Sequence, residues 1–384
     1  MVFSAKDFLA RQMEMTKRMD ANGIDWLYVS PGSDFQYLTG MEAGRSERPH
    51  ALLLSRQGER ALLCPAFEAD YLSGITDIET LLTWEEHQDP FALFAEHGRE
   101  SGGSIGRIGL GPQCAYGEFV GIQSVFGDAA VVPATALIKG MRVIKTDQEM
   151  RVMRDVAAIT EAVLDEAFAE EFTPGISERE LASRIVNRGL QSGLHTASAT
   201  VLSGPNSSFP HGRTGDRPIA EDEVVFVDFV TTKYGYHADI TQTVVFGRPD
   251  PRALEIYAVV QEAARSAAAA AAPGVRAQEL DRCARSVIDR AGYGEHFTHR
   301  LGHGLGLDVH EDPYLVEGND GRMAPAYSHV DVHAGRLMSN MVMTIEPAIY
   351  IRGELGIRIE DDVAVGDDGC EPLTANVDKG LARS

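Results

Sequence analysis

The sequence has few cysteines and no long apolar stretch, features that would mark a disulfide-bonded, secreted or membrane protein. Only four of its 384 residues are cysteine, no CxxC pair occurs, and no secretory apolar segment stands near the start. We therefore expect no disulfide framework and a reduced, cytoplasmic location. The longest strongly apolar stretch, 267–273, is far shorter than the roughly 20 residues that span a bilayer, so we expect no integral membrane segment.

Positive charge is also scarce. The chain has 35 Lys and Arg residues against 57 Asp and Glu residues, which gives a formal net charge of -22. A protein that binds nucleic acid or an anionic membrane surface needs a basic patch, so neither is an expected partner. The length and the 44% hydrophobic content allow a substantial core and favour two domains over one.

Apolar periodicity divides the chain into two parts. Residues 5–22 have helical spacing, and 26–29 and 51–54 are typical of strands, which predicts a small α/β unit. Thr146 and Glu149 have the spacing of a capping box, so we expect a long helix from there to about Glu171. We place the boundary just before it, giving domains 1–138 and 139–384. Predicted helices at 177–192 and 252–272, with β-rich runs at 224–228 and 342–351, indicate an α+β second domain.

Two pairs of acids stand in apolar, strand-like runs of the second domain. Asp228 and Asp239 are eleven residues apart, a separation that a hairpin would bring together. Glu346 and Glu360 are fourteen residues apart and flank a turn at 353–356. An isolated carboxylate in apolar surroundings costs several kcal/mol, so these acids predict a cationic partner.

His303 lies between the two acidic pairs, with a glycine on each side. Glycine lets another backbone segment approach closely, and a neutral imidazole is a common ligand of Zn, Mn or Co. Four carboxylates and one histidine carry about four negative charges, which two divalent ions would neutralise while still binding a hydroxide. The composition therefore favours two metal ions over one, and it does not distinguish Mn, Co and Zn.

A series of motifs, taken in order, resembles the pita-bread metallopeptidases, a family that includes prolidase (Xaa-Pro dipeptidase), Xaa-Pro aminopeptidase, methionine aminopeptidase and creatinase. The motifs are SGPNSSFPH at 203–211, Asp228 with Asp239, GHG at 302–304, HE at 310–311, IEP at 345–347 and RIED at 358–361. YLTG at 37–40 and RP at 48–49 resemble the creatinase-type N-terminal domain. Methionine aminopeptidases lack that domain, so the resemblance points to the prolidase and aminopeptidase P branch.

The resemblance implies a pita-bread catalytic domain after a smaller creatinase-like α/β domain, a homodimer, and hydrolysis of the amide bond before proline in Xaa-Pro dipeptides or short peptides. It makes Asp239 and Glu360 bridging ligands of two divalent ions, Asp228 a ligand of one ion, and His303 and Glu346 ligands of the other. A metal-bridging hydroxide would attack the carbonyl, with Glu346 also acting as general base.

Two further histidines receive roles from the same resemblance. His211 and His310 would flank the tetrahedral intermediate as hydrogen-bond donors without binding metal. An ordinary, satisfied loop histidine is the alternative for each of them.

Three positions beside the ligands differ from the usual family pattern. The chain has Val230 and Ala348 where relatives have glycine, and Gln242 where they have arginine. Residues beside ligands shape the pocket, so a non-peptidase amide hydrolase acting on a small metabolite stays open as an alternative. A metal-free creatinase-like or binding protein is a third alternative, which the presence of all five ligands disfavours.

The segment 319–336 is longer than relatives of this size usually have before the glutamate strand. It contains Arg322 and Arg336. A dipeptidase must recognise a free carboxylate near the scissile bond, and a guanidinium binds a carboxylate through paired hydrogen bonds. We therefore expect one of these arginines to bind substrate, with solvated loop charges as the equal alternative.

Overall fold

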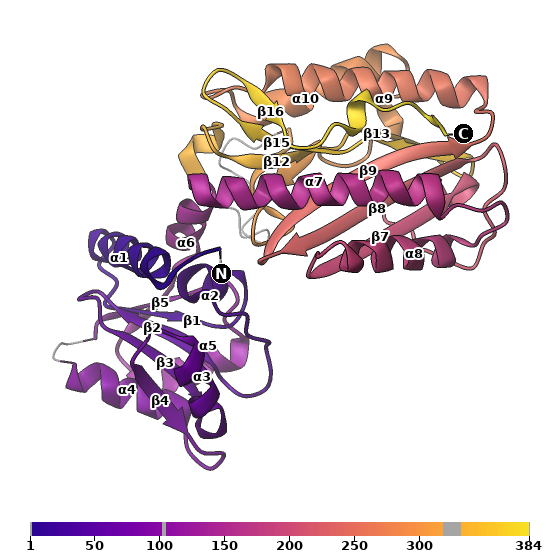
Figure 1. Cartoon of the computed structure of the whole chain (residues 1–384). Coiled ribbons are helices and arrows are strands. Elements are labelled where there is room, and N and C mark those ends of the chain that lie inside the picture. Colours follow the sequence, from indigo (N-terminus) through magenta and orange to yellow (C-terminus); the bar gives the residue numbers. More distant parts are fainter. Residues whose placement is uncertain (1, 102–104, 318–331, 384) are drawn as a thin grey trace. The chain divides into compact units, whose positions relative to one another are not determined.

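The computed structural model describes residues 2–101, 105–317 and 332–383. The chain divides into two compact units, Met1–Arg142 and Val143–Ser384 (Figure 1). The sequence predicts this boundary between residues 138 and 139.

The first unit is built around a six-stranded sheet with the order β4-β3-β2-β1-β5-β6. β1 pairs antiparallel with β2 and parallel with β5. The strands are β1 Trp26–Val29, β2 Ala51–Ser55, β3 Arg60–Pro65, β4 Thr80–Trp84, β5 Arg107–Leu110 and β6 Ala130–Pro133; the helices are α1 Ala5–Ala21, α2 Ser33–Thr39, α3 Ala69–Ile75, α4 Pro90–Glu100, α5 Tyr116–Phe126 and α6 Thr135–Arg142. Tyr28, Leu53 and Phe94 are fully buried in its core. The predicted small α/β unit is confirmed.

Four long helices belong to the second unit: α7 Asp147–Glu170, α8 Glu178–Gln191, α9 Pro251–Ala270 and α10 Ala277–Arg290. The capping box that opens α7 forms as predicted. The Thr146 backbone N–H donates to Glu149 Oε2 at 2.8 Å, and the Glu149 N–H donates to Thr146 Oγ1 at 3.3 Å. Among the described residues, no helix is both long and apolar enough to cross a bilayer.

The strands of the second unit form a four-stranded sheet, β17-β9-β8-β7, a five-stranded sheet, β11-β10-β12-β15-β16, and the hairpin β13-β14. Their bounds are β7 Thr196–Ser203, β8 Val224–Lys233, β9 Tyr236–Phe246, β10 Gly302–Gly304, β11 Glu311–Leu315, β12 Val342–Ile345, β13 Ala348–Ile351, β14 Leu355–Arg358, β15 Asp361–Val365, β16 Cys370–Pro372 and β17 Ala382–Arg383. β8 and β9 form the hairpin expected between Asp228 and Asp239. The second unit is α+β, as predicted.

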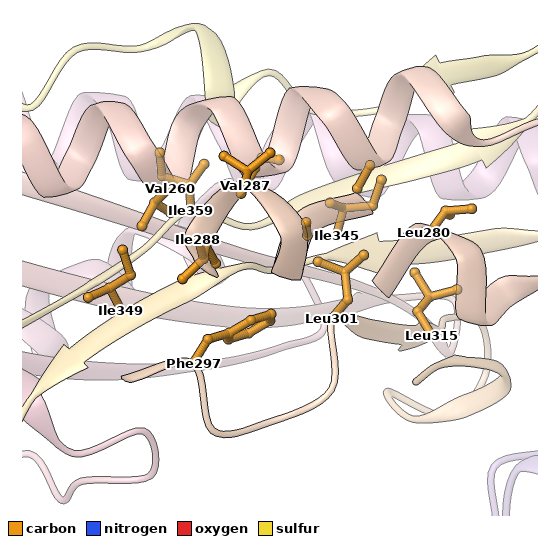
Figure 2. Packing of buried hydrophobic residues seen from close by; sticks show 14 of the residues in the cluster. Val260, Leu280, Val287, Ile288, Phe297, Leu301, Leu315, Ile345, Ile349 and Ile359 are labelled. Carbon is orange, nitrogen blue, oxygen red and sulfur yellow. The ribbon is translucent and has the colours of Figure 1, made fainter. Parts of the chain in front are cut away.

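The helices pack on the strands in two pairs (Figure 1). α7 and α8 cover one face of β7, β8 and β9, where they bury Val225, Val227 and Phe229. α9 and α10 bury the other strands in a second core, and Figure 2 shows Val260 of α9 and Ile288 of α10 among its residues. The strand faces that turn away from these two cores are where polar side chains can gather.

Candidate metal centre and active site

The β8-β9 hairpin positions the two aspartates. Val227 and Phe229 point into the core under α7 and α8, so Asp228 between them points to the opposite face. The register pairs Asp228 with Thr241 and Val230 with Asp239. Directly paired residues share a face, so the two aspartates are diagonal neighbours on the side away from α7 and α8.

The two glutamates are directed by the same alternation. Ile345 and Ile359 are buried in the second core, seen in Figure 2, which leaves Glu346 and Glu360 on the other side of their segments. β12 and β15 pair Ile345 with Asp361, so Glu346 directly follows and Glu360 directly precedes this last pair of the two strands.

Glu360 also meets the aspartate hairpin. Its backbone N–H donates to the Thr241 carbonyl at 3.1 Å, and Thr241 Oγ1 donates to Glu360 Oε2 at 2.6 Å. Thr241 pairs with Asp228 across the hairpin. This contact therefore brings the glutamate strands to the face that carries Asp228 and Asp239.

His303 lies on β10, where neighbouring backbone leaves no space for side chains on either side of it. A Cβ at Gly302 would lie 2.1 Å from the Thr344 carbonyl oxygen, and one at Gly304 would lie 2.0 Å from the Asp312 carbonyl oxygen. The two glycines thus allow β10 to fit closely between its neighbours.

The imidazole of His303 is oriented for metal binding. Nδ1 lies 3.1 Å from the Gly304 carbonyl, which can only accept, so Nδ1 carries the proton. Nε2 then faces the acids, 3.4 Å from Glu346 Oε1 and 3.9 Å from Asp239 Oδ2. Asp239, His303 and Glu360 are all buried, and each offers a ligand atom within 4.8 Å of the others. These donors fit a divalent ion.

Burial sets the protonation of this cluster in the absence of a cation. It raises the pKa of Asp239 and Glu360 well above the usual range, with a further rise from the neighbouring carboxylates. It also raises the pKa of Glu346 to about 7 and lowers that of His303 well below its usual value. All three carboxyl groups resist ionisation here, so a bound cation would stabilise their charged forms.

Asp228 has a different partner, because its carboxylate accepts a hydrogen bond from Arg358 Nη2. Arg358 is buried, donates through Nε to Thr241 Oγ1 at 2.9 Å and lies 3.3 Å from the Tyr350 hydroxyl. The charge of the Arg358 guanidinium was not included when the charges of the metal ligands were added from the sequence. Four carboxylates and one arginine leave about three negative charges, still more than one divalent ion neutralises.

The five expected ligands line one cavity of about 430 Å³. His211 and His310 line it too, and the imidazole of His310 lies 4.2 Å from that of His303, centre to centre, at 76°. Burial, followed by the charge of Arg300, lowers the pKa of His310 and favours its neutral form. The other described lining residues are His299, Arg300, Val316 and Arg358.

Of the two arginines from which we expected one substrate-binding residue, Arg336 lies in the described part of the chain and is not among these lining residues. Arg336 is exposed, and its Nη1 donates to the Gly274 carbonyl at 2.7 Å. Arg322 lies outside the residues that the structure describes.

Sequence reasoning gave no role to His299, Arg300 or Arg358, although all three line the cavity. A signal was present for each. His299 and Arg300 directly precede the GHG segment, and Arg358 opens the RIED motif.

Comparison with known proteins agrees with this site. Residues 151–367 match metallopeptidase family M24, and residues 11–144 match the creatinase/prolidase N-terminal domain. A probable dipeptidase PepE of Mycobacterium bovis is 34% identical over 94% of this chain and 92% of its own. An uncharacterized peptidase of Staphylococcus aureus is 32% identical over 91% and 94%.

A solved structure is similar over nearly the whole length. The recombinant prolidase of Thermococcus sibiricus has a TM-score of 0.88 and 34% identity, covering 98% of this chain and 99% of that one. The match includes both units, so it extends to the pita-bread catalytic domain and the domain before it. The chain therefore belongs to metallopeptidase family M24 and carries a creatinase/prolidase N-terminal domain ahead of its catalytic domain.

Proposed function

We propose that this metallopeptidase hydrolyses the amide bond before proline in Xaa-Pro dipeptides or short peptides, using two divalent ions (Mn, Co or Zn). One observation carries the proposal: Asp228, Asp239, His303, Glu346 and Glu360 line a single cavity together with two further imidazoles. Bound divalent ions would polarise the scissile carbonyl and lower the pKa of an attacking water. Asp228, Asp239, His303, Glu346 and Glu360 would hold the ions.

The chain's own residues supply the proton transfer. Glu346 is the general base, because its carboxylate lines the cavity 3.4 Å from His303 Nε2, where it can accept a proton from an attacking water. His310 and His211 donate hydrogen bonds to the oxygen that becomes negative as the carbonyl is attacked. In His310 the lowered pKa favours a neutral ring, which donates through one nitrogen.

A non-peptidase amide hydrolase is the rival proposal, and it was motivated by Val230, Gln242 and Ala348. None of the three is among the described residues that line the cavity. Gln242 instead donates to Asn376 Oδ1 at 2.7 Å. These departures therefore do not require a different substrate class.

The test combines metal analysis with turnover. We expect two divalent ions per chain and cleavage of Xaa-Pro dipeptides in preference to Xaa-Pro tripeptides and ring amides. Asp239→Ala should abolish activity and reduce the bound metal, because it removes one of the three buried ligand groups that lie within 4.8 Å of one another. Asp216→Ala is the matched control, since Asp216 is an exposed acid paired with Arg179.

Two outcomes contradict the proposal: full activity of Asp239→Ala without bound metal, and turnover confined to ring amides, which favours the rival hydrolase. Faster cleavage of tripeptides than of dipeptides would indicate an aminopeptidase and leave cleavage before proline standing. The proposal also includes a cytoplasmic homodimer, and light scattering after gel filtration tests the dimer.

A further inference from the structure

Arg300 is a cation of the cavity wall without an acidic partner. It is half-buried, and it makes no ion pair with any residue in 2–101, 105–317 or 332–383. Arg358, also in the wall, differs in this respect because it is bonded to Asp228. Arg300 therefore keeps its hydrogen-bonding capacity for a group that enters the cavity.

The backbone on both sides of Arg300 is held in place from α10. Arg285 donates to the carbonyls of Phe297, at 3.0 Å, and His299. Asp281 Oδ1 accepts from the Leu301 N–H at 3.0 Å, and Asp281 is itself paired with Arg285 at 2.7 Å. One ion pair on a helix thus fixes the segment that carries Arg300.

The guanidinium of Arg300 is also positioned relative to the metal ligands. Its Cζ lies 4.5 Å from the centre of the Tyr314 ring. Tyr314 pairs directly with His303 across β10 and β11. The planar guanidinium can stack on this ring and still direct N–H groups into the cavity.

A dipeptide carries its free carboxylate one residue beyond the scissile bond, within roughly 3.3–3.6 Å per residue of extended chain. A site that prefers dipeptides therefore needs a cation close to the metal centre, and an arginine fork binds a carboxylate through two parallel hydrogen bonds. We infer that Arg300 binds the free carboxylate of a dipeptide substrate and so determines specificity for dipeptides. This inference rests on the proposed function.

The experiment compares an Xaa-Pro dipeptide with its C-terminal amide. In Arg300→Gln the KM for the free dipeptide should rise about 10- to 100-fold, the loss expected for hydrogen bonds to a charged group. The KM for the amide should change less than about twofold, because the amide has no carboxylate for Arg300 to bind. Arg300→Lys should lose less than Arg300→Gln, since the positive charge remains.

Arg154→Gln is the matched control, because it removes the same charge from an exposed arginine of α7 that pairs with Glu371. Equal losses of Arg300→Gln on free and amidated substrates overturn the inference. A rise in the KM for the free dipeptide that occurs in Arg336→Gln but not in Arg300→Gln also overturns the inference. Circular dichroism and metal content of Arg300→Lys guard against misfolding. A wild-type enzyme that cleaves the tripeptide or the amide faster than the dipeptide also overturns the inference. A wild-type enzyme that cleaves neither Xaa-Pro dipeptides nor longer Xaa-Pro peptides overturns the proposed function itself.

Discussion

His310 touches the imidazole of His303, yet it is not one of the three buried residues whose ligand atoms gather within 4.8 Å. We therefore predict that His310→Ala lowers kcat by about 10²–10⁴-fold, the range for a lost proton donor or oxyanion contact. Metal stoichiometry should stay unchanged, as measured by elemental analysis of the purified variant. Loss of one metal equivalent would instead make His310 a ligand.

Individual ligands were predictable because their surroundings are local. Asp228 ends an apolar run and Asp239 follows within hairpin distance, so the strand pattern alone directs both to one face. Arg358 was not predictable as the partner of Asp228, because 130 residues separate the two and no local pattern links them. The position of Arg300 could not be predicted for the same reason, because its stacking on Tyr314 depends on the pairing of β10 with β11.

The first residue of α8 holds the segment that carries His211. Glu178 is completely buried, and its Oε1 accepts from the Ser203 N–H at 2.8 Å and from Asn206 Nδ2 at 3.1 Å. Its Oε2 accepts from the Gly215 N–H at 3.0 Å. One carboxylate therefore binds both ends of the segment 203–215.

We predict that Glu178→Gln lowers kcat about 10-fold or more and costs about 1–3 kcal/mol of stability, because an amide nitrogen would face an N–H donor. Glu180→Gln is the control, since Glu180 is an exposed α8 residue paired with Arg184. If Glu178 acts through His211, its effect on kcat should disappear in a His211→Ala background. Independent, additive losses in the double variant would refute that coupling.

Elements differ in how far the sequence determines them. The start of α7 was predictable because the Thr146 capping box is a local interaction. The predicted run 342–351 is in fact two strands, β12 and β13, which pair with different partners. The contact between Glu360 and Thr241 also needs long-range pairing, which apolar periodicity does not specify.

At the scale of the whole molecule, the buried acids connect stability to metal and pH. In the metal-free chain burial raises the pKa of Asp239, Glu346 and Glu360 above their unfolded values, for Glu346 to about 7. Their contribution to stability is therefore complete below the unfolded pKa, near 4. It is lost as pH rises through the folded pKa, by up to roughly 1.4 kcal/mol per pH unit and group.

We predict that the Tm of the metal-free protein falls by several degrees between pH 5 and 8, where carboxyl groups with a raised pKa, including Glu346 with a pKa of about 7, ionise in the folded chain. The metal-loaded protein should change little, because bound cations stabilise the ionised acids. Calorimetry with and without a chelator measures both curves. In the metal-free protein, Glu346→Gln should reduce the change of Tm with pH. If Tm changes with pH equally with and without metal, these acids do not control the pH dependence of stability.

The tight fit of β10 has a consequence for how this enzyme can acquire new substrates. In a gene library randomised at codons 300, 302 and 304, selection for any metal-dependent turnover should return glycine at 302 and 304, because neighbouring carbonyl oxygens occupy the space of a Cβ. Residue 300 lies two positions before Gly302 and lines the cavity instead. If Arg300 binds the substrate carboxylate, variation there would change which substrates are recognised, so a single short segment would hold both an invariant and an adaptable part of the enzyme.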